Sequence, residues 1–549
     1  IIVVVQPLRR LKSEQRQKAE AAGCHAVLLE GGNRNQTAAT MQDIIHKQLE
    51  CNVLFLTPEM WGMNDDVANA LSTLTKQDRI ERVVIDEAHC ISKWGQDFRP
   101  QYRELSRLKD DFPEANIAAF TATADQATRE DIAKQLSNNK FSIIVKGFDR
   151  PNLSLRVESK QDIKNDIIGI LEEKKGQSGI IYCLSRKETD ATAEFLKEKG
   201  LNAIAYHAGK TGDERKKAQD RFMTEASVIM VATIAFGMGV DKPDVRFVIH
   251  ASLPSSIEAF YQEIGRAGRD GNNSDTIMFY GLQDLVMRQR MIFEGDKDED
   301  YKFMEYKRLE TLMGYCETAS CRRKALLSHF DEQIEECGNC DNCLEKPLVV
   351  DYSNEAKMIL NAIKDTGQFF GAAHITDVVS GAETAKIKER KHDQLNSFNS
   401  MSSYPKTFVS SLIRLLVAFG ALRINFERYG AITLTEIANE ILSDTRPFEA
   451  KKIVQGQKRT SSQSSVQREE VKIENQDLLQ ILKNLRMDLA KEKNVPAFVI
   501  FPDRTLHEMA NAKPTSRQDF LDISGVGEKK LDEYFSPFSE AILSYLALE

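Results

Sequence analysis

Short apolar runs alternate with amphipathic stretches over residues 1–285, and this rhythm constrains the fold more than any other feature. Runs of three to six apolar residues suit buried strands, and strands that alternate with helices indicate parallel sheets covered on both faces. The predicted strands are 1–5, 26–29, 53–57, 83–86, 117–121 and 143–145 in a first unit, and 179–184, 203–206, 228–232, 247–250 and 276–280 in a second. The sequence therefore predicts a multidomain α/β protein with two tandem parallel-sheet units.

Changes in pattern divide the rest of the chain. A residue that precedes proline is biased away from helix, so the segment before Pro151 is a plausible joint between the two units. A Gln/Ser/Lys-rich stretch nearly free of apolar residues is typical of a flexible linker. The predicted divisions are 1–150 and 151–285 for the α/β units, 286–350 for a helical cysteine-bearing module, 351–450 for a domain with a hairpin at 426–434 that turns near 429–430, 451–470 for the linker, and 471–549 for a small helical domain.

Composition excludes several classes of protein. The chain is 42% hydrophobic, which is the range of globular proteins, and its apolar runs are far shorter than the ~18 residues that a membrane span needs. We therefore expect no membrane partner. A net charge of -8 argues against coating of nucleic acid through overall basicity but leaves room for local basic grooves. Nine cysteines, an odd number, favour free thiols in a reducing compartment.

Two acidic residues, Asp86 and Glu87, follow the predicted strand 83–86, and His89 comes two residues later. Open α/β sheets bind ligands at the carboxyl ends of their strands. In nucleoside triphosphatases an acidic residue at this position holds Mg²⁺ and a neighbouring one polarises the attacking water. A solvated loop that carries two acids by chance is the alternative interpretation.

The second unit carries arginines that suit a phosphate. Arg266 and Arg269 are three residues apart between glycines, a spacing that places both on one face of a helix. Guanidinium is planar, permanently charged and bidentate, which suits developing phosphoryl charge. A structural ion-pair role is the weaker alternative. The glycine-punctuated segment 232–241, with Thr233, could approach a phosphate of nucleotide or nucleic acid.

Three cysteines, Cys337, Cys340 and Cys343, are each separated by two residues. This spacing predicts a closed tetrahedral Zn²⁺ site with four thiolates. The fourth ligand is Cys321 or Cys316, and disulfides are the less favoured alternative.

Together with Thr121–Thr123 and Tyr182–Arg186, these segments resemble the ordered motifs of superfamily 2 helicases. Residues 86–102 resemble the aromatic-rich loop of RecQ DNA helicases nearly residue for residue, and residues 266–271 agree with that family. Residues 495–501 and 524–527 resemble the helicase-and-ribonuclease C-terminal (HRDC) domain. The resemblance covers the whole chain. It implies two RecA-like domains, a helical zinc-binding module, a winged-helix (RQC) domain and an all-α HRDC-like domain. It also implies an ATP-dependent 3′→5′ DNA helicase that acts in recombination and repair.

The resemblance also implies site residues, cofactors and partners. Cys321 becomes the preferred fourth zinc ligand, because Cys321-Arg322-Arg323 matches a Cys-Arg-Arg of the family. The implied cofactors are ATP, Mg²⁺ and Zn²⁺, and the implied partners are single-stranded and branched duplex DNA, with a single-stranded DNA-binding protein as a further candidate. We expect a cytoplasmic, nucleoid-associated location in a bacterium. The implied residues are Asp86, Glu87, His89, Gln262, Arg266 and Arg269 for catalysis, Asp86, Thr121, Thr123, Gly239 and Asp241 for the nucleotide, and Thr57, Pro58, Trp94, Phe98, Arg99, Ser185, Arg186 and Thr233 for nucleic acid.

A phosphate-cradling loop of the form Gly-x-x-x-x-Gly-Lys-Ser/Thr is absent from the sequence. The only Gly-Lys-Thr begins at Gly209, and Ile204 stands where the first glycine belongs. The sequence begins with Ile inside a predicted strand, so we expect that a preceding segment with the loop is missing and that these 549 residues alone do not hydrolyse ATP. The alternatives are a nucleotide-blind scaffold that binds DNA junctions and, from another class, an RNA helicase. Residues 386–391 carry a local charge of +3, which fits DNA contact and a solvated helix face about equally well.

Overall fold

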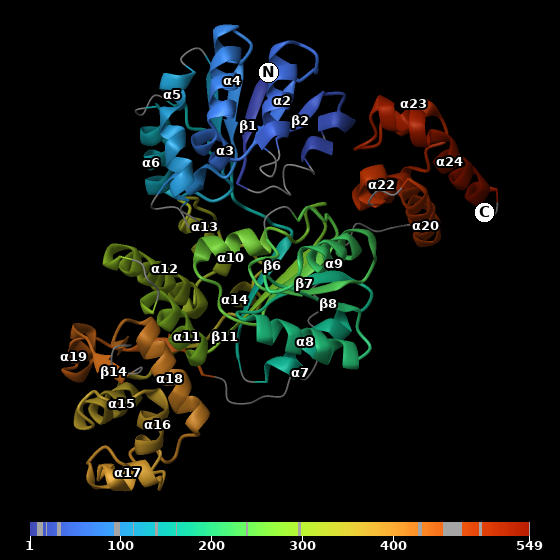
Figure 1. Ribbon diagram of the computed structural model, residues 1–549. Coiled ribbons are helices and arrows are strands. Elements are labelled where there is room, and N and C mark those ends of the chain that lie inside the picture. The colour runs from blue at the N-terminus through green and yellow to red at the C-terminus, as the bar shows by residue number, and fades with distance from the viewer. Residues whose placement is uncertain are drawn as a thin grey trace.

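Figure 1 shows the computed structural model of the protein, in which separate domains are joined in chain order. The described residues are 1–547 apart from 8–14, 18, 30–33, 93–98, 113–114, 138–140, 161, 238–239, 295–297, 426–430, 454–474 and 494–496. The turn of the expected hairpin and most of the expected linker lie outside the described residues.

The first domain is a parallel sheet in the strand order β2-β3-β1-β4-β5. Its strands are rich in valine, isoleucine and leucine, and Val3, Leu54 and Val83 are fully buried, as expected for a sheet covered on both faces. Helices lie on both sides of this sheet (Figure 1). The elements are β1 (Ile2–Val5), β2 (Ala26–Leu28), α2 (Arg34–Ile45), β3 (Val53–Leu56), α3 (Pro58–Met63), α4 (Asp65–Lys76), β4 (Arg82–Ile85), η1 (Ala88–Ile91), η2 (Pro100–Arg107), α5 (Leu108–Asp111), β5 (Asn116–Ala119) and α6 (Gln126–Ser137).

The second domain is also a parallel sheet, in the order β6-β11-β10-β7-β9-β8. The order means that the strands on either side of β7 come from later parts of the chain, so crossover helices must return along the sheet faces. The elements are β6 (Leu153–Ser159), α7 (Ile163–Glu173), β7 (Ser178–Tyr182), α8 (Arg186–Glu198), β8 (Ala203–Tyr206), α9 (Gly212–Thr224), β9 (Ile229–Ala232), β10 (Val245–His250), α10 (Ile257–Ile264), β11 (Ser274–Tyr280) and α11 (Leu282–Phe293).

The expected strand at 143–145 is wrong. Residues 141–150 form an irregular connection between the two domains. Ile143, Ile144 and Val145 are 53%, 84% and 51% exposed. A run of three apolar residues is too short to show the periodicity that distinguishes a strand from an extended connection. In the described sheets, no strand pairs with this run.

The cysteine-bearing module and the winged-helix domain follow. The expected hairpin at 426–434 begins earlier than predicted. Its first strand, β13, starts at Leu422 and ends at Asn425, and it pairs antiparallel with β14, which starts at Ala431. The elements of these two domains are α12 (Glu299–Glu317), α13 (Arg322–Ser328), α14 (Asp341–Leu344), β12 (Val349–Asp351), α15 (Ser353–Asp365), α16 (Ala372–Val379), α17 (Ala385–Glu389), η3 (His392–Gln394), α18 (Lys406–Ala418), β13 (Leu422–Asn425), β14 (Ala431–Leu434), α19 (Glu436–Leu442) and β15 (Glu449–Lys451).

The C-terminal domain contains helices only among its described residues and buries a core of its own around Phe501 and Phe538. Its helices are α20 (Gln476–Glu492), α21 (Ala497–Ile500), α22 (Asp503–Ala512), α23 (Arg517–Leu521) and α24 (Glu528–Leu546). In the part of the chain that the structure describes, no helix combines the length and the apolar character that crossing a membrane requires.

The hydrophobic cores show which parts of the chain form one body. One continuous core runs from the second sheet through α12 and α13 into the winged-helix domain, so that Leu155, Leu312 and Leu412 belong to the same cluster. The first domain has a separate core that includes Leu54 and Val83. The first domain is therefore joined to the rest by connections and polar contacts and shares no core with it among the described residues.

Close packing between β7 and β10 gives a stability test. A Cβ atom at Gly179 would lie 2.1 Å from the buried Phe247 ring, so Gly179→Ala forces a shift in the core of the second sheet. We expect the free energy of unfolding of this domain to fall by about 1–3 kcal/mol, the usual cost of overpacking. Chemical denaturation followed by fluorescence or circular dichroism measures it.

Gly169→Ala is the matched control. Gly169 lies in α7 with open space around its Cβ position, so alanine should leave stability unchanged or raise it by up to about 1 kcal/mol. Equal stability of the two variants would contradict the packing argument.

Candidate active site

Two acidic side chains lie at the carboxyl end of β4, between β1 and β5. The amide Nε2 of Gln6 donates to Oδ2 of Asp86 at 2.9 Å, and the backbone N–H of Glu87 donates to Oδ1 of Asp86 at 3.0 Å. The hydroxyl of the buried Tyr102 donates to the backbone carbonyl of Asp86 at 3.1 Å. Burial raises the pKa of Tyr102, so this hydroxyl remains protonated and available as a donor. The Asp86 carboxylate is thus held in one orientation.

Glu87 has a left-handed backbone, with φ of 51°. This conformation costs a residue other than glycine about 1 kcal/mol or more, and it persists only where the surroundings impose it. The carboxylate of Glu87 lies 3.4 Å from Nδ1 of His89, and the same nitrogen lies 3.0 Å from Oγ1 of Thr121. His89 is only 3% exposed, so it connects the acidic pair to the loop after β5 rather than facing solvent.

A chain of polar contacts continues from this loop to the second domain. The backbone N–H of Thr123 donates to Oγ1 of Thr121 at 3.3 Å. Nε2 of Gln262, at the end of α10, donates to Oγ1 of Thr123 at 2.8 Å. The acidic pair and α10 are therefore linked across the boundary between the two domains.

The two predicted arginines follow α10 and lie in the turns after it, so their expected place on one face of a helix is wrong. Gly265 ends α10, and the positive φ of Gly268 breaks the helical backbone between Arg266 and Arg269. Arg266 is 7% exposed, and its Nη2 lies 3.2 Å from the position that a Cβ atom at Gly237 would take, so the glycine leaves room for the guanidinium. Its buried Nε has no hydrogen-bond partner among the described residues. Arg269 pairs with Asp241 at 2.7 Å, and both side chains are 38% exposed. Gly239 lies outside the described residues.

The turn that carries these arginines is braced by the connection between the domains. Gly268 has a positive φ of 54°, and a Cβ there would lie 2.4 Å from Nδ2 of Asn152, so only glycine fits. Asn152 and Arg150 each donate to the carbonyl of Gly268 at 2.9 Å, and Arg150 also donates to that of Ala267 at 2.9 Å. These contacts fix the backbone on which Arg266 is mounted.

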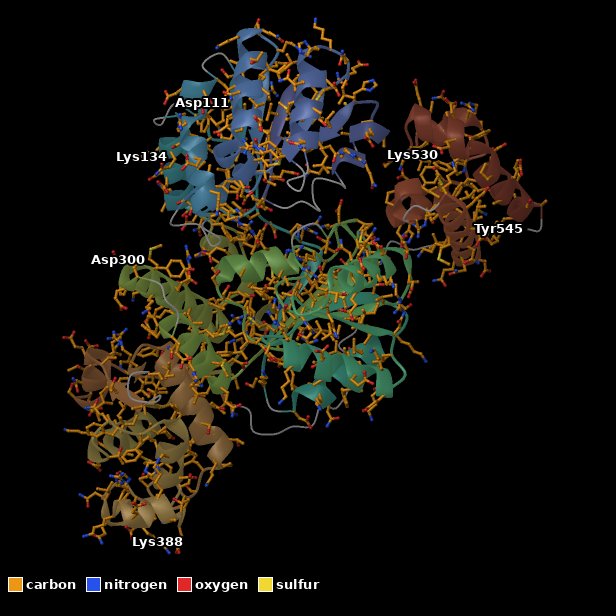
Figure 2. All side chains as sticks on the ribbon, viewed as in Figure 1. Asp111, Lys134, Asp300, Lys388, Lys530 and Tyr545 are labelled. Atoms are coloured by element: carbon orange, nitrogen blue, oxygen red, sulfur yellow. The ribbon has the colours of Figure 1, made fainter. Side chains whose placement is uncertain are left out.

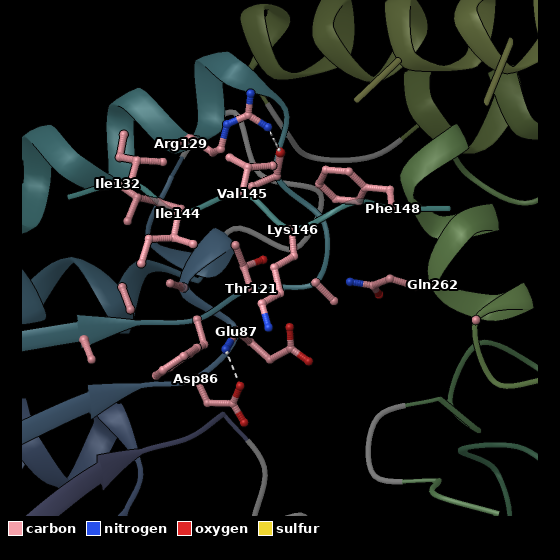
Figure 3. Close-up of a pocket in the computed structure, with 18 of the residues that line it drawn as sticks. Asp86, Glu87, Thr121, Arg129, Ile132, Ile144, Val145, Lys146, Phe148 and Gln262 are labelled. Carbon is pink, nitrogen blue, oxygen red and sulfur yellow. Dashed lines mark hydrogen bonds between the residues drawn. The ribbon is translucent and has the colours of Figure 1, made fainter. Parts of the chain in front are cut away.

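A cavity of about 1130 Å³ is lined by the acidic pair and by Gln262 (Figure 3). Asp86 and Glu87 line it from the first domain, and Gln262, Arg266 and Arg269 line it from the second. The rest of its lining comes from α6, β5 and the connection between the domains. It is mostly apolar, with Ile117, Ile132, Ile143, Ile144 and Val145, and also includes Arg129 and Lys146. The site therefore combines carboxylates, guanidinium groups and an apolar wall, which is the composition of a ligand pocket.

The residues predicted to contact nucleic acid follow strands of both sheets. Trp94 and Phe98 lie outside the described residues, and Arg99 donates to the carbonyl of Pro7 at 3.4 Å. Thr57 and Pro58 begin α3, and Thr57 is buried. Ser185 caps α8 with its hydroxyl, Arg186 is exposed at the start of that helix, and Thr233 follows β9.

The Sγ atoms of Cys321, Cys337, Cys340 and Cys343 all lie within 4.8 Å of one another, and Cys316 is not part of this group. Backbone N–H groups of Arg322 and Lys324 donate to Cys340 and Cys321 at 3.3 and 3.5 Å, the kind of support that thiolate ligands require. A hydrogen bond from the side chain of Cys337 lowers the pKa of Cys340. Four thiols in one cluster fit a tetrahedral Zn²⁺ ion.

The sequence did not reveal the role of Gln6. Its side chain is fully buried, and its Nε2 donates to the carboxylate of Asp86. Its Oε1 has no hydrogen-bond partner among the described residues. The available signal was a polar residue at the carboxyl end of β1, the strand beside β4, where open sheets gather their ligand-binding groups.

Five family models match successive parts of the chain. They are the DEAD/DEAH box helicase model at residues 1–132, the helicase conserved C-terminal domain at 161–271, the RecQ zinc-binding model at 282–344, the RQC domain at 346–459 and the HRDC domain at 475–542. The architecture is therefore two RecA-like domains, a zinc-binding module, an RQC winged helix and an HRDC domain. Among solved structures, Saccharomyces cerevisiae Dbp5 bound to RNA and ADP BeF3 is 19% identical, with a TM-score of 0.39 over 57% of this chain and 81% of that chain.

Similar curated proteins match along the whole chain. The ATP-dependent DNA helicase RecQ of Haemophilus influenzae is 36% identical over 100% of this chain and 88% of its own length. RecQ of Pasteurella multocida is 36% identical over 99% of this chain and 85% of its own length. RecQ of Bacillus subtilis is 31% identical over 99% of this chain and 89% of its own length. The match over full length, together with the zinc-binding, RQC and HRDC domains, shows that the chain belongs to the RecQ family of ATP-dependent DNA helicases.

Proposed function

We propose that the inter-domain cavity is the ATP hydrolysis site of a 3′→5′ DNA helicase that acts in recombination and repair. The observation that carries the proposal is that Asp86 and Glu87 of one domain and Arg266 and Arg269 of the other line the same cavity. Carboxylates on one side and guanidinium groups on the other suit a magnesium-bound triphosphate. The buried Nε of Arg266, which has no described partner, fits an additional anionic ligand.

Each residue then takes a role that its contacts support. Asp86 would hold Mg²⁺, which neutralises phosphate charge, and Glu87 would orient the attacking water. Arg266 and Arg269 would stabilise the charge that develops on the transferred phosphoryl group. Thr121 and Thr123, linked to His89 and Gln262, would transmit the state of the nucleotide between the domains.

Single-stranded DNA would cross both helicase domains at the loops after their strands. Thr57, Ser185, Arg186 and Thr233 follow such strands, and Trp94, Phe98 and Arg99 come after the acidic pair in the sequence. Hydroxyls and arginines contact phosphates, and aromatic faces stack on any base. We propose single-stranded and branched duplex DNA as the substrates and a single-stranded DNA-binding protein as a partner.

The basic segment at α17 supports a duplex contact by the winged-helix domain. Lys386 and Lys388 lie on α17, with Arg390 and Lys391 directly after it. Lys388 lies at the end of this domain that is farthest from the two helicase domains (Figure 2). A positive surface at that distance can reach duplex DNA that extends away from the motor.

Hydrolysis also needs a phosphate-binding loop, and no Gly-x-x-x-x-Gly-Lys-Ser/Thr occurs in the 549 residues. The segment at Gly209 takes a different role, because Thr211 caps α9 and Lys210 pairs with Asp190. We propose that a chain of these residues alone does not hydrolyse ATP in the presence of DNA. Joining it to a phosphate-binding loop of the family should restore hydrolysis and unwinding.

Glu87→Gln tests the catalytic assignment in such a joined protein. Glutamine keeps the size of the side chain but cannot act as a base, so DNA-stimulated phosphate release should fall by about 10²–10⁴-fold. Phosphate release measured at saturating ATP and single-stranded DNA gives the number. Glu81→Gln, on an exposed side chain of the same domain, should keep the rate of the parent protein. Equal rates for Glu87→Gln and the parent would remove Glu87 from the mechanism. If the 549 residues alone already hydrolysed ATP and lost that activity with Glu87→Gln, the loop requirement would be wrong.

The four clustered thiols are the proposed Zn²⁺ ligands. Cys321→Ser removes one ligand and should lower the zinc content well below one ion per chain, with earlier melting of the zinc-binding module, because structural zinc contributes directly to folding. Cys316→Ser should keep its zinc, since Cys316 is buried outside the group. Metal analysis and thermal melts check both variants. Retained zinc in Cys321→Ser and lost zinc in Cys316→Ser would reverse the assignment.

A further inference from the structure

A short segment after α13, residues 329–332, contacts three parts of the molecule at once. We call it the hinge-contact segment. It begins where α13 ends, and α13 itself is capped at its start by Cys321, whose Sγ accepts from the N–H of Lys324. The position of the segment is therefore tied to the thiol cluster through one rigid helix.

The segment is firmly attached to the second domain. Nε2 of His329 lies 2.6 Å from Oε1 of Glu258 on α10. Phe330 is 1% exposed, stacks on Phe148 with ring centroids 4.8 Å apart, and packs against Tyr261 of α10 at 4.9 Å. Buried aromatic contacts of this kind persist through small domain movements because separating them would expose a large apolar area.

The segment also holds the connection between the domains. The backbone N–H of Phe148 donates to the carboxylate of Glu332, and Tyr261 donates to the carbonyl of Phe148 at 2.8 Å. In the first turn of α13, Arg323 pairs with Asp149 at 2.8 Å. The end of the connection next to the second domain is thus fixed on the zinc-binding module.

The contact with the first domain is of a different kind. Nη2 of Arg129 on α6 donates to Oδ2 of Asp331 at 3.0 Å, and the two side chains are 19% and 53% exposed. Nη1 of the same arginine donates to the carbonyl of Ala124 at 2.9 Å, next to Thr123, which accepts from Gln262. A partly exposed ion pair contributes little to stability, so it can break and form again without unfolding either domain.

These contacts form a closed ring around the cavity. The ring runs from the hinge-contact segment through Arg129 to the loop that holds Thr123, across to Gln262 on α10, and back through Tyr261 to Phe330. Arg129, Thr121, Gln262 and Phe148 surround the same cavity in Figure 3. The half of the ring at Phe330 is buried and apolar, and the half at Arg129 is polar and partly exposed.

We propose that Arg129 and Asp331 form a reversible latch through which the zinc-binding module sets the position of the first domain relative to α10. Both are positioning residues, because they act through the loop with Thr123 and through Gln262 and not on the reacting atoms. The inference rests on the proposed function, since the cavity that the latch spans is the proposed ATP site.

Distance measurements between spin labels test the latch without any nucleotide. Labels are placed on exposed positions of the two domains, at Ser72→Cys on α4 and Glu198→Cys on α8, in the full chain with Cys24→Ser. The parent protein should give one narrow distance distribution. Asp331→Asn and Arg129→Gln should each at least double its width. Asparagine suits this test because, like aspartate, it tolerates the left-handed backbone of residue 331, where φ is 65°.

Two further variants separate a latch from general damage. Exchanging the charges with Arg129→Asp and Asp331→His together, measured at about pH 5.5 where histidine is protonated, should bring the width back toward that of the parent at the same pH, and histidine is among the residues that tolerate the left-handed backbone of position 331. Glu335→Gln, on a nearby exposed acid of the same module, should leave the distribution unchanged. Raising the salt to about 1 M should broaden the parent distribution as the single variants do, because screening then acts over about 3 Å.

Each outcome decides the proposal. Zinc content of one ion per chain in all variants shows that the module is folded. An unchanged narrow distribution in Asp331→Asn with zinc bound would overturn the latch, and so would failure of the exchanged pair to narrow the distribution. Absence of ATP hydrolysis in the joined protein would reject the proposed function and leave the distance result standing, so the two failures are distinguishable.

Discussion

The division of one cavity between two sheets is the constraint on which the rest of this structure depends. Parallel sheets gather polar groups at the carboxyl ends of their strands, and each sheet here supplies half of a complementary set. Asp86 is positioned by the core of the first domain, which is separate from the rest. Arg266 is positioned by a core that extends from the second domain into the winged helix. The distance between the carboxylates and the guanidinium groups therefore depends on how the two domains are placed relative to each other. Polar contacts between the domains, such as Gln262–Thr123, help to fix that placement.

The sequence predicted those features that depend on the spacing of residues close together in the chain. The acidic pair follows a buried strand and the cysteines have ligand spacing, so each could be found within a few residues of chain. The arginines were also found locally, but their predicted helical placement is wrong because both lie in turns after α10. The features it missed depend on distant partners. Residues 143–145 were predicted as a strand from their apolar side chains, which are visible in the local sequence. Whether another strand lies beside them depends on distant parts of the chain, and in the described sheets none does. The role of Gln6 depends on a strand 80 residues away, and the first strand of the hairpin starts before the predicted range because its pairing partner fixes the register.

The zinc-binding module contributes more than a local fold. Arg322 is almost fully buried, and its Nε donates to both carboxylate oxygens of Asp341, while its Nη1 donates to the carbonyl of Tyr315 at 2.9 Å. Asp341 in turn accepts from the backbone N–H of Val157 in β6. A charge at this depth is tolerated only when it is paired and hydrogen-bonded, so the module cannot shift relative to the second sheet without exposing an unpaired charge to an apolar interior. The module, the second domain and the winged helix are consequently held together by one continuous core and by this buried ion pair.

The apolar side chains that face the cavity have a thermal consequence. Ile143, Ile144 and Val145 are largely exposed in this structure and line the wall of the cavity next to α6. Any movement that narrows the cavity removes their surface from water, and burial of apolar surface lowers the heat capacity. The balance between the wide and the narrow cavity therefore shifts with temperature, and cooling favours the wide one because the hydrophobic gain weakens in the cold. Through these three side chains, the connection between the domains makes the width of the cavity sensitive to temperature.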